Sequence, residues 1–112
     1  MSDPVSNIDV HGAVEELGHG AYLLDVREDD EWSAGRVAAA THIRLSELPD
    51  RFNELPRDRT ILCICRAGGR SAKAAAFLLE QGFAPRNVEG GMQSWALSQY
   101  PLTGDTEEPR II

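Results

Sequence analysis

The chain has 112 residues, which corresponds to about one domain with a single modest core. Its 18 acidic and 11 basic residues give a formal net charge of −7, which argues against non-specific binding to nucleic acid or to an anionic membrane surface. No apolar stretch approaches the roughly 18 residues of a membrane span, and the start MSDPVSNIDV lacks the basic and then apolar order of a secretory signal. We therefore expect a single-domain cytoplasmic protein.

Apolar runs and helical stretches alternate along the chain, which favours βα units around a parallel sheet. In chain order, we expect an edge strand at 5–10, a helix at 11–18, a strand at 21–27, a helix at 28–34, a strand at 40–45, a helix at 46–53, a strand at 60–65, a helix at 71–81, a strand at 87–90 and a helix at 92–99. The runs AYLLDVR and TILCIC are nearly continuous in apolar residues, as is typical of central parallel strands covered on both faces. The predicted fold class is α/β, with a mostly parallel five-stranded sheet and helices on both faces.

The expected domain spans residues 1–104. Residues 105–112 carry charge and proline without any periodicity, so we expect a mobile C-terminal tail. The clearest helix within the domain is 71–81, where the pattern predicts Ser71 as the cap at the start and Gly82 as the stop at the end.

The chain has two cysteines, Cys63 and Cys65, which lie two positions apart in an expected strand. The strand geometry holds their Cβ atoms too far apart for a disulfide, so both are expected to be free thiols, as in a reducing compartment. Burial in the core is the expectation for Cys63, since free cysteine is among the most buried residue types. For Cys65, an inert position in the core is the alternative interpretation. The glycines and arginines that follow Cys65 argue against that interpretation.

The stretch CRAGGRS begins at Cys65 and leads from a central strand into a helix, which is where ligands bind in open α/β sheets. Gly68 and Gly69 allow positive φ, so that successive N–H groups can form a nest for an anion. The start of the helix adds a partial positive charge. Such surroundings lower the pKa of a thiol, and Cys65 is therefore a candidate nucleophile.

Arg66 and Arg70 lie in the same loop and are either solvated surface charges or groups that hold an oxyanion. The histidines, His11, His19 and His42, are scattered over different segments and form neither a helix-spaced metal pair nor an evident general base. We expect no metal and no cofactor.

Four stretches of the chain resemble the rhodanese (thiosulfate sulfurtransferase) family. CRAGGRS is similar to the active-site loop of that family, LLDVREDDEW to the signature at its second strand, GRVAAATHIRLSEL to its stretch of the form G-H-I-P-G-A-x-x-I-P, and NVEGGMQSW to its closing strand and the Gly-Gly turn before a Trp-bearing helix. The resemblance covers about residues 5–102. It departs after Gly35, where Arg36, Ala38 and Ala39 replace the usual His, Pro and Gly.

The resemblance implies that Cys65 takes the sulfane sulfur of thiosulfate, or of a similar small anionic donor, and carries it as a persulfide to cyanide or a thiol. Thioredoxin and sulfur-carrier proteins are further acceptors that it suggests. The chain would act as a monomer or a homodimer. The implied donor-binding residues are Arg66, Ala67, Gly68, Gly69, Arg70 and Ser71.

Asp25 and Arg27 are expected to support the rim of the site, with Glu31 as a possible partner of Arg27.

Three alternative functions remain open. A cysteine phosphatase or arsenate reductase places five residues between its Cys and Arg, whereas four separate Cys65 from Arg70. A thiol redox protein would have to use Cys63 with Cys65, which lack the C-x-x-C spacing. A non-catalytic rhodanese-like interaction module would usually have lost the cysteine, so the presence of Cys65 argues against that class.

Overall fold

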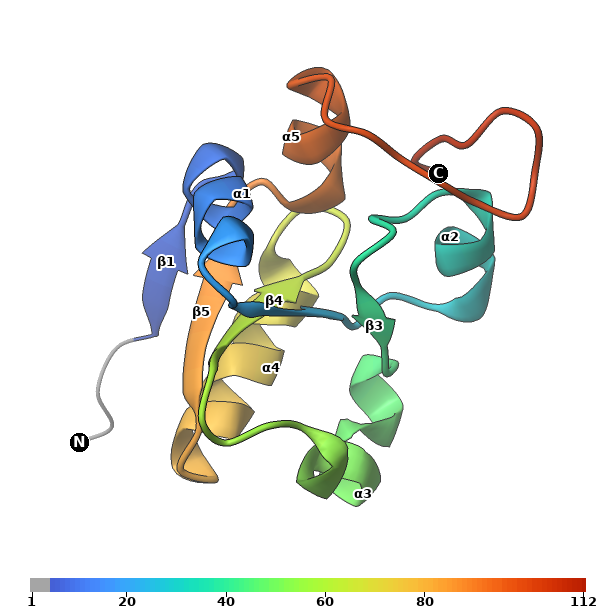
Figure 1. Ribbon diagram of the computed structural model, residues 1–112. Helices are drawn as coiled ribbons and strands as arrows, with labels where there is room; N and C mark the ends of the chain where they lie inside the picture. Colours follow the sequence, from blue (N-terminus) through green and yellow to red (C-terminus); the bar gives the residue numbers. More distant parts are fainter. Residues whose placement is uncertain (1–4) are drawn as a thin grey trace.

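The computed structural model describes residues 5–112, which form a twisted sheet covered by helices (Figure 1). The strands are β1 (Ser6–Ile8), β2 (Tyr22–Asp25), β3 (Thr41–His42), β4 (Thr60–Ile64) and β5 (Ala84–Val88). The helices are α1 (Val10–Gly18), α2 (Asp29–Ala34), α3 (Leu48–Arg51), α4 (Gly69–Glu80) and α5 (Gly91–Leu97), and short 3-10 turns at Leu45–Glu47 and Phe52–Glu54 flank α3. The strand order is β1-β5-β4-β2-β3, and every neighbouring pair is parallel.

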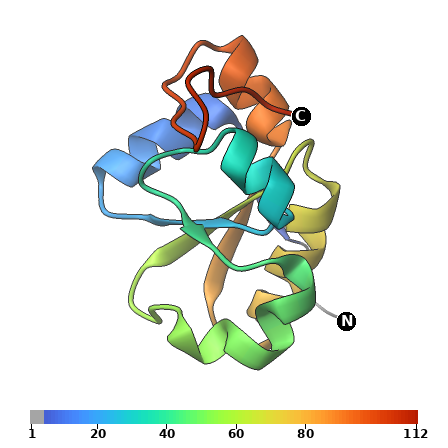
Figure 2. The ribbon, with the colours of Figure 1, turned by 90° about the vertical axis from the view of Figure 1, so that its right-hand side faces the viewer.

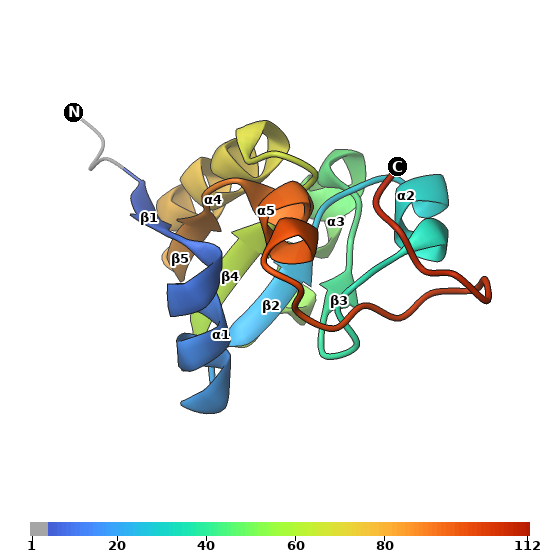
Figure 3. The same cartoon turned by 90° about the horizontal axis from the view of Figure 1, so that it is seen from above.

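The helices lie on both faces of the sheet, with α3 and α4 on one side and α1 and α5 on the other (Figure 3). Successive residues of β4 contribute their side chains to opposite faces of the sheet. Cys63 belongs to the apolar cluster under α4, whereas Leu62 and Ile64 belong to the cluster that contains Met92 and Trp95 of α5. The predicted fold class, an α/β five-stranded sheet with helices on both faces, is confirmed.

Two predicted element boundaries were wrong for identifiable reasons. α4 begins at Gly69, before the expected cap at Ser71, because Gly68 takes the left-handed conformation (φ 115°) and itself occupies the N-cap position. The strand expected at 87–90 lies at Ala84–Val88. Pro85 is tolerated there because it pairs with β4 alone, and the register with β1 begins one residue later, at Arg86.

Other elements are shorter than expected. The helix expected at 46–53 is divided into a 3-10 turn, α3 and a second 3-10 turn, with Pro49 in the first turn of α3, where a missing N–H costs nothing. The strand expected at 40–45 pairs only at Thr41 and His42. The last predicted helix ends at Leu97, and Gln99 then takes a positive φ of 62°.

The C-terminal segment 103–112 runs back over α2 (Figures 1 and 2). Arg36 and Thr103 exchange main-chain hydrogen bonds of 2.8 Å, and the Arg110 N–H donates to the Ala34 carbonyl at 2.9 Å. Gly35 is needed at this contact, since a Cβ there would overlap the backbone of Arg110. These contacts describe where the segment lies and not how it moves, so the mobility expected for residues 105–112 stays a prediction.

None of the helices described between residues 5 and 112 has the length and apolar character that crossing a membrane requires.

Candidate active site

Cys65 follows β4 directly, at the carboxyl end of the parallel sheet. The side chain is 1% exposed, and the residue's carbonyl accepts a hydrogen bond of 2.8 Å from the N–H of Met92 at the start of α5. The chain then turns through Arg66 and Ala67 into Gly68, whose positive φ directs its N–H back to the sulfur, 3.1 Å from Sγ. The thiol therefore lies at the bottom of a tight strand-to-helix loop, as the sequence predicted.

The surroundings of the Cys65 sulfur favour the thiolate. Burial by itself raises the pKa of this thiol, but hydrogen bonds from the Ser71 side chain and from the backbone N–H groups of Ser71, Gly68 and Ala67 outweigh it. The net effect lowers the pKa of Cys65 below its ordinary value. A thiolate held by fixed N–H donors is a nucleophile that needs no general base.

A buried polar chain extends from the sulfur to β5. The Ser71 hydroxyl lies 3.2 Å from Cys65 Sγ and donates to Asn87 Oδ1 at 2.6 Å. Asn87 Nδ2 in turn donates to the Gly68 carbonyl at 3.3 Å, so that Asn87 is joined both to the hydroxyl and to the loop. The sequence analysis did not identify Asn87. A polar residue in a strand beside β4 is the only signal in the sequence that could have found it.

Cys63 and Cys65 are both buried in the same apolar cluster, but their pKa values shift in opposite directions. Burial, together with the nearby Cys65, raises the pKa of Cys63 to about 12. Both cysteines are free, as expected. The prediction that Cys63 is a core residue is confirmed.

Arg70 is held in a bidentate ion pair with Glu31 of α2, at 2.6 and 2.9 Å. The hydrogen bond from Arg70 lowers the pKa of Glu31 to about 2, although burial acts in the opposite direction. The same hydrogen bond raises the pKa of Arg70. The sequence analysis suggested Glu31 as a partner for Arg27. That assignment needs correction, because Arg27 reaches only the main-chain oxygen of Glu31, at 3.2 Å.

Asp25 and Arg27 form a fully buried ion pair behind the loop. Arg27 Nη2 donates to Asp25 Oδ2 at 2.8 Å, and Arg27 Nε lies 3.0 Å from Oδ1. The same Nη2 also donates to the Gly35 carbonyl at 2.7 Å. Because Arg27 bonds Asp25 at the end of β2, the Glu31 carbonyl within α2 and the Gly35 carbonyl after it, the pair braces the helix that presents Glu31 to Arg70.

Arg66 finds its partners on the other side of the loop. Its Nε donates to the main-chain oxygen of Ile112 at 2.9 Å. With the Gln93 amide turned so that its oxygen faces the guanidinium, that oxygen accepts from Arg66 Nη1 at 2.7 Å. The two arginines of the loop therefore reach different elements, Arg70 towards α2 and Arg66 towards α5 and the C-terminal segment.

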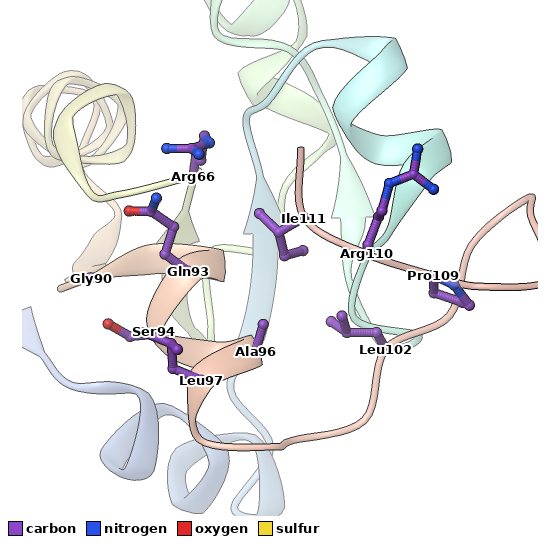
Figure 4. A pocket seen from close by; sticks show the side chains of 10 residues that line it. All are labelled: Arg66, Gly90, Gln93, Ser94, Ala96, Leu97, Leu102, Pro109, Arg110 and Ile111. Atoms are coloured by element: carbon purple, nitrogen blue, oxygen red, sulfur yellow. The ribbon is translucent and has the colours of Figure 1, made fainter.

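Two cavities flank the loop. One of about 290 Å³ lies beside Arg70 and is lined also by Val26, Glu28, Leu45 and Ser46. The other, of about 610 Å³, begins at Arg66 and runs between α5 and the C-terminal segment (Figure 4). No group of three or more His, Cys, Asp and Glu side chains within residues 5–112 is arranged to hold a metal ion.

Residues 9–98 match the Rhodanese-like domain family, and the chain belongs to that family. It is 46% identical over 83 residues to "Putative sulfurtransferase YtwF" of Bacillus subtilis, covering 74% of this chain and 77% of that one. It is also 33% identical over 90 residues to thiosulfate sulfurtransferase GlpE of Pseudomonas entomophila, covering 80% of each chain. The family that the sequence motifs suggested is confirmed.

Solved structures agree with this assignment. A rhodanese-related protein from Thermoplasma volcanium superposes with a TM-score of 0.83 at 37% identity, over 88% of this chain and 97% of that one. The chain also matches 16% of the Bacillus anthracis CoADR-RHD chain, with a TM-score of 0.79 at 36% identity. Similarity to relatives named as sulfurtransferases supports a transferase activity.

Proposed function

We propose that this protein is a sulfurtransferase that moves the sulfane sulfur of thiosulfate, or of a similar anionic donor, through a persulfide on Cys65. The observation that carries the proposal is the Cys65 sulfur at the closed end of the loop, 3.1 Å from the Gly68 N–H, with a lowered pKa. The similarity to a protein named thiosulfate sulfurtransferase supports thiosulfate as the donor.

The proposed first step needs no proton transfer at the sulfur. The Cys65 thiolate attacks the outer sulfur of thiosulfate, and a new S–S bond forms while the sulfur–sulfur bond of the donor breaks. The electron pair of that bond leaves with sulfite, and the persulfide stays on Cys65. An acceptor, cyanide or a thiolate, then attacks the outer sulfur and returns the electron pair to Cys65.

The loop supplies electrostatic stabilisation in both steps. The N–H groups from Ala67 to Ser71 are fixed by the turn and by α4, so they can hold the thiolate and then the persulfide without reorganisation. In this proposal Arg66 attracts the anionic donor. Arg70 shapes the rim, since Glu31 already neutralises its charge.

The proposal extends to the partners and the setting of the reaction. Acceptors are cyanide, a low-molecular-weight thiol, thioredoxin or a sulfur-carrier protein, and the chain works in the cytoplasm as a monomer or homodimer. A sulfur-carrier role is the second candidate, because the chain is 40% identical over 86 residues to "Putative sulfur carrier protein YrkF" of Bacillus subtilis, covering 76% of this chain and 43% of that one.

Intact-mass spectrometry before and after incubation with thiosulfate tests the proposal. We expect a gain of about one sulfur atom that cyanide removes. Cys65→Ser should abolish the gain, and Cys63→Ser, the matched control, should retain it. A folded protein that gains no sulfur would exclude thiosulfate as the donor and favour another sulfur source or a carrier role.

A further inference from the structure

The C-terminal segment, residues 103–112, reaches the arginine that follows the candidate nucleophile (Figure 4). Arg66 Nε donates to the main-chain oxygen of Ile112 at 2.9 Å, and the Gln93 amide oxygen accepts from Arg66 Nη1. Gln93 is an exposed side chain that can move with the guanidinium, whereas the Ile112 oxygen belongs to a main chain that is attached to α2. The segment is therefore the fixed partner of Arg66.

The attachment of the segment to α2 combines main-chain hydrogen bonds with one ion pair. Thr103 and Arg36 exchange main-chain bonds of 2.8 Å, and the Asp105 N–H donates to the Ser33 carbonyl at 2.8 Å. The ion pair joins Arg36 Nη2 to Asp105 Oδ1 at 2.8 Å. Hydrogen bonds from Arg36 and Ser33 lower the pKa of Asp105, so this carboxylate is charged at neutral pH.

The guanidinium of Arg66 does not serve the Cys65 sulfur in this arrangement. Within residues 5–112, the hydrogen bonds to Cys65 Sγ come from Ser71 and from backbone N–H groups of the loop. Arg66 instead donates to a neutral main-chain oxygen. Hydrogen bonds from a guanidinium to an anion are stronger than those to a neutral carbonyl, so a small anion can replace the Ile112 oxygen.

We propose that the C-terminal segment is an autoinhibitory strap that holds Arg66 away from the Cys65 sulfur, and that the ion pair between Arg36 and Asp105 is its latch. The inference rests on the proposed function, in which Arg66 attracts the anionic donor. When the latch opens, the Ile112 oxygen leaves Arg66, and the guanidinium turns towards the sulfur. The donor competes with the strap for Arg66, so the strap weakens donor binding without changing the reactivity of the thiolate.

Two alkylating reagents of similar size measure the charge near Cys65 without any sulfur transfer. Iodoacetate is an anion and iodoacetamide is neutral, so the ratio of their rates at Cys65 reports the positive potential near the sulfur. Asp105→Arg places a like charge against Arg36 and opens the latch. We expect this variant to raise the ratio of the iodoacetate rate to the iodoacetamide rate about threefold.

Three further variants control for the change in net charge. Glu107→Arg makes the same change two residues away, at an exposed side chain that forms no ion pair within residues 5–112, so it should alter the ratio much less. Arg36→Asp combined with Asp105→Arg restores an ion pair and should return the ratio to that of the wild type. In an Arg66→Gln background, Asp105→Arg should raise the ratio no more than Glu107→Arg does.

Three outcomes would overturn the proposal. Equal ratios in Asp105→Arg and Glu107→Arg would show that the ion pair with Arg36 is not a latch. A rise that persists in the Arg66→Gln background would show that the strap does not act through Arg66. A fall of the ratio in Asp105→Arg would show that the segment positions Arg66 for an anion instead of withholding it.

Turnover gives a second measurement. With thiosulfate as the donor and cyanide as the acceptor, Asp105→Arg should lower the KM for thiosulfate about threefold relative to Glu107→Arg and leave kcat unchanged. Equal KM values in the two variants would overturn the strap as a barrier to the donor. If thiosulfate loads no sulfur on the wild type, the proposed function fails, and the alkylation ratio still decides whether the strap restrains Arg66.

Discussion

At the scale of single residues, the Cys65 thiolate depends on a hydroxyl group that has one proton and two acceptors. Ser71 donates that proton to Asn87 Oδ1 at 2.6 Å, while Cys65 Sγ lies 3.2 Å from the same oxygen. When Cys65 is a thiol, its S–H can donate to Ser71. When Cys65 ionises, the hydroxyl stabilises it best by turning away from Asn87 towards the sulfur. Asn87 therefore competes with the thiolate for the Ser71 proton.

Two substitutions measure this competition. Ser71→Ala removes the donor, and we expect the pKa of Cys65 to rise, because a hydrogen bond to the charged form of the thiol is lost. Asn87→Asp has the same shape but adds a negative charge that holds the proton and repels the thiolate, so it should also raise the pKa of Cys65. The pH dependence of iodoacetamide alkylation, followed by mass spectrometry, reports both shifts.

The internal control is Cys63, which should stay unmodified in the native protein because burial raises its pKa to about 12. In the wild type we expect the alkylation midpoint of Cys65 to lie below the roughly 8.5 of an ordinary cysteine. A midpoint that does not move in Ser71→Ala would show that the backbone N–H groups alone set the pKa of Cys65.

Glu31 makes stability depend on pH. Its pKa is lowered from 4.5 to about 2 in the fold, so the ion pair with Arg70 stabilises the protein fully above pH 4.5, and this contribution is lost as the pH falls towards 2. Because Arg70 is 35% exposed, we discount the full linkage value and expect Glu31→Gln to lower the free energy of unfolding at pH 7 by about 1–2 kcal/mol.

Urea denaturation of wild type and Glu31→Gln at pH 7 and pH 3 tests the sign. The difference between the two proteins should shrink to less than half at pH 3. Glu54→Gln breaks an exposed ion pair with Arg51, which also lowers the pKa of Glu54, so this comparison variant should show a smaller dependence in the same direction. A Glu31→Gln penalty that is equal at both pH values would mean that packing, and not charge, is lost.

At the scale of secondary-structure elements, the first turn of α5 fixes the backbone of the reactive loop. The N–H groups of Met92 and Gln93 donate to the carbonyls of Cys65 and Arg66, at 2.8 and 3.0 Å. This approach is possible because Gly91 has no side chain. A Cβ at Gly91 would overlap both carbonyl groups, and its φ of 54° lies in the left-handed region.

Gly91→Ala should therefore damage stability and reactivity together. We expect a loss of roughly 2–4 kcal/mol in the free energy of unfolding, from backbone strain and overlap, and slower alkylation of Cys65 because the loop is displaced. Thermal and urea unfolding with timed alkylation measure both. Gly18→Ala is the control. Gly18 lies at the end of α1 with open space around it, so stability should rise by up to about 1 kcal/mol with Cys65 unaffected. Alkylation at the wild-type rate in Gly91→Ala would contradict this role of α5.

The sequence predicted the elements whose signals are local. β2 and β4 follow from continuous apolar runs, and the reactive loop follows from a cysteine placed between such a run and a helix. The start of α4 was missed because the pattern made Ser71 look like a cap, whereas its hydroxyl faces Cys65 and Asn87. The pairing of Glu31 with Arg70 could not be predicted, since 39 residues separate them and only the folded α2 brings them together.

At the scale of the whole molecule, the C-terminal segment adds to the apolar cluster that contains Met92 and Trp95, and it forms one wall of the cavity beside α5. Ile111 packs on the apolar cluster under α5. Arg36, which stands where the family usually has His, pairs with Asp105 at 2.8 Å and lies over the Trp32 ring, 4.8 Å from its centroid. The departure from the family pattern therefore serves to attach this segment to α2.

Hydrogen exchange can decide how firmly the segment is attached. The N–H of Arg110 donates to the Ala34 carbonyl at 2.9 Å, but this bond lies outside the sheet and the helices, so we expect it to exchange roughly a hundredfold faster than the amides of β4 and more slowly than an unstructured chain. Gly35→Ala places a Cβ against the backbone of Arg110 and should remove this protection while leaving β4 protected. Protection of Arg110 equal to that of β4 would contradict the prediction of a mobile tail, because the segment would then open only when the whole domain unfolds.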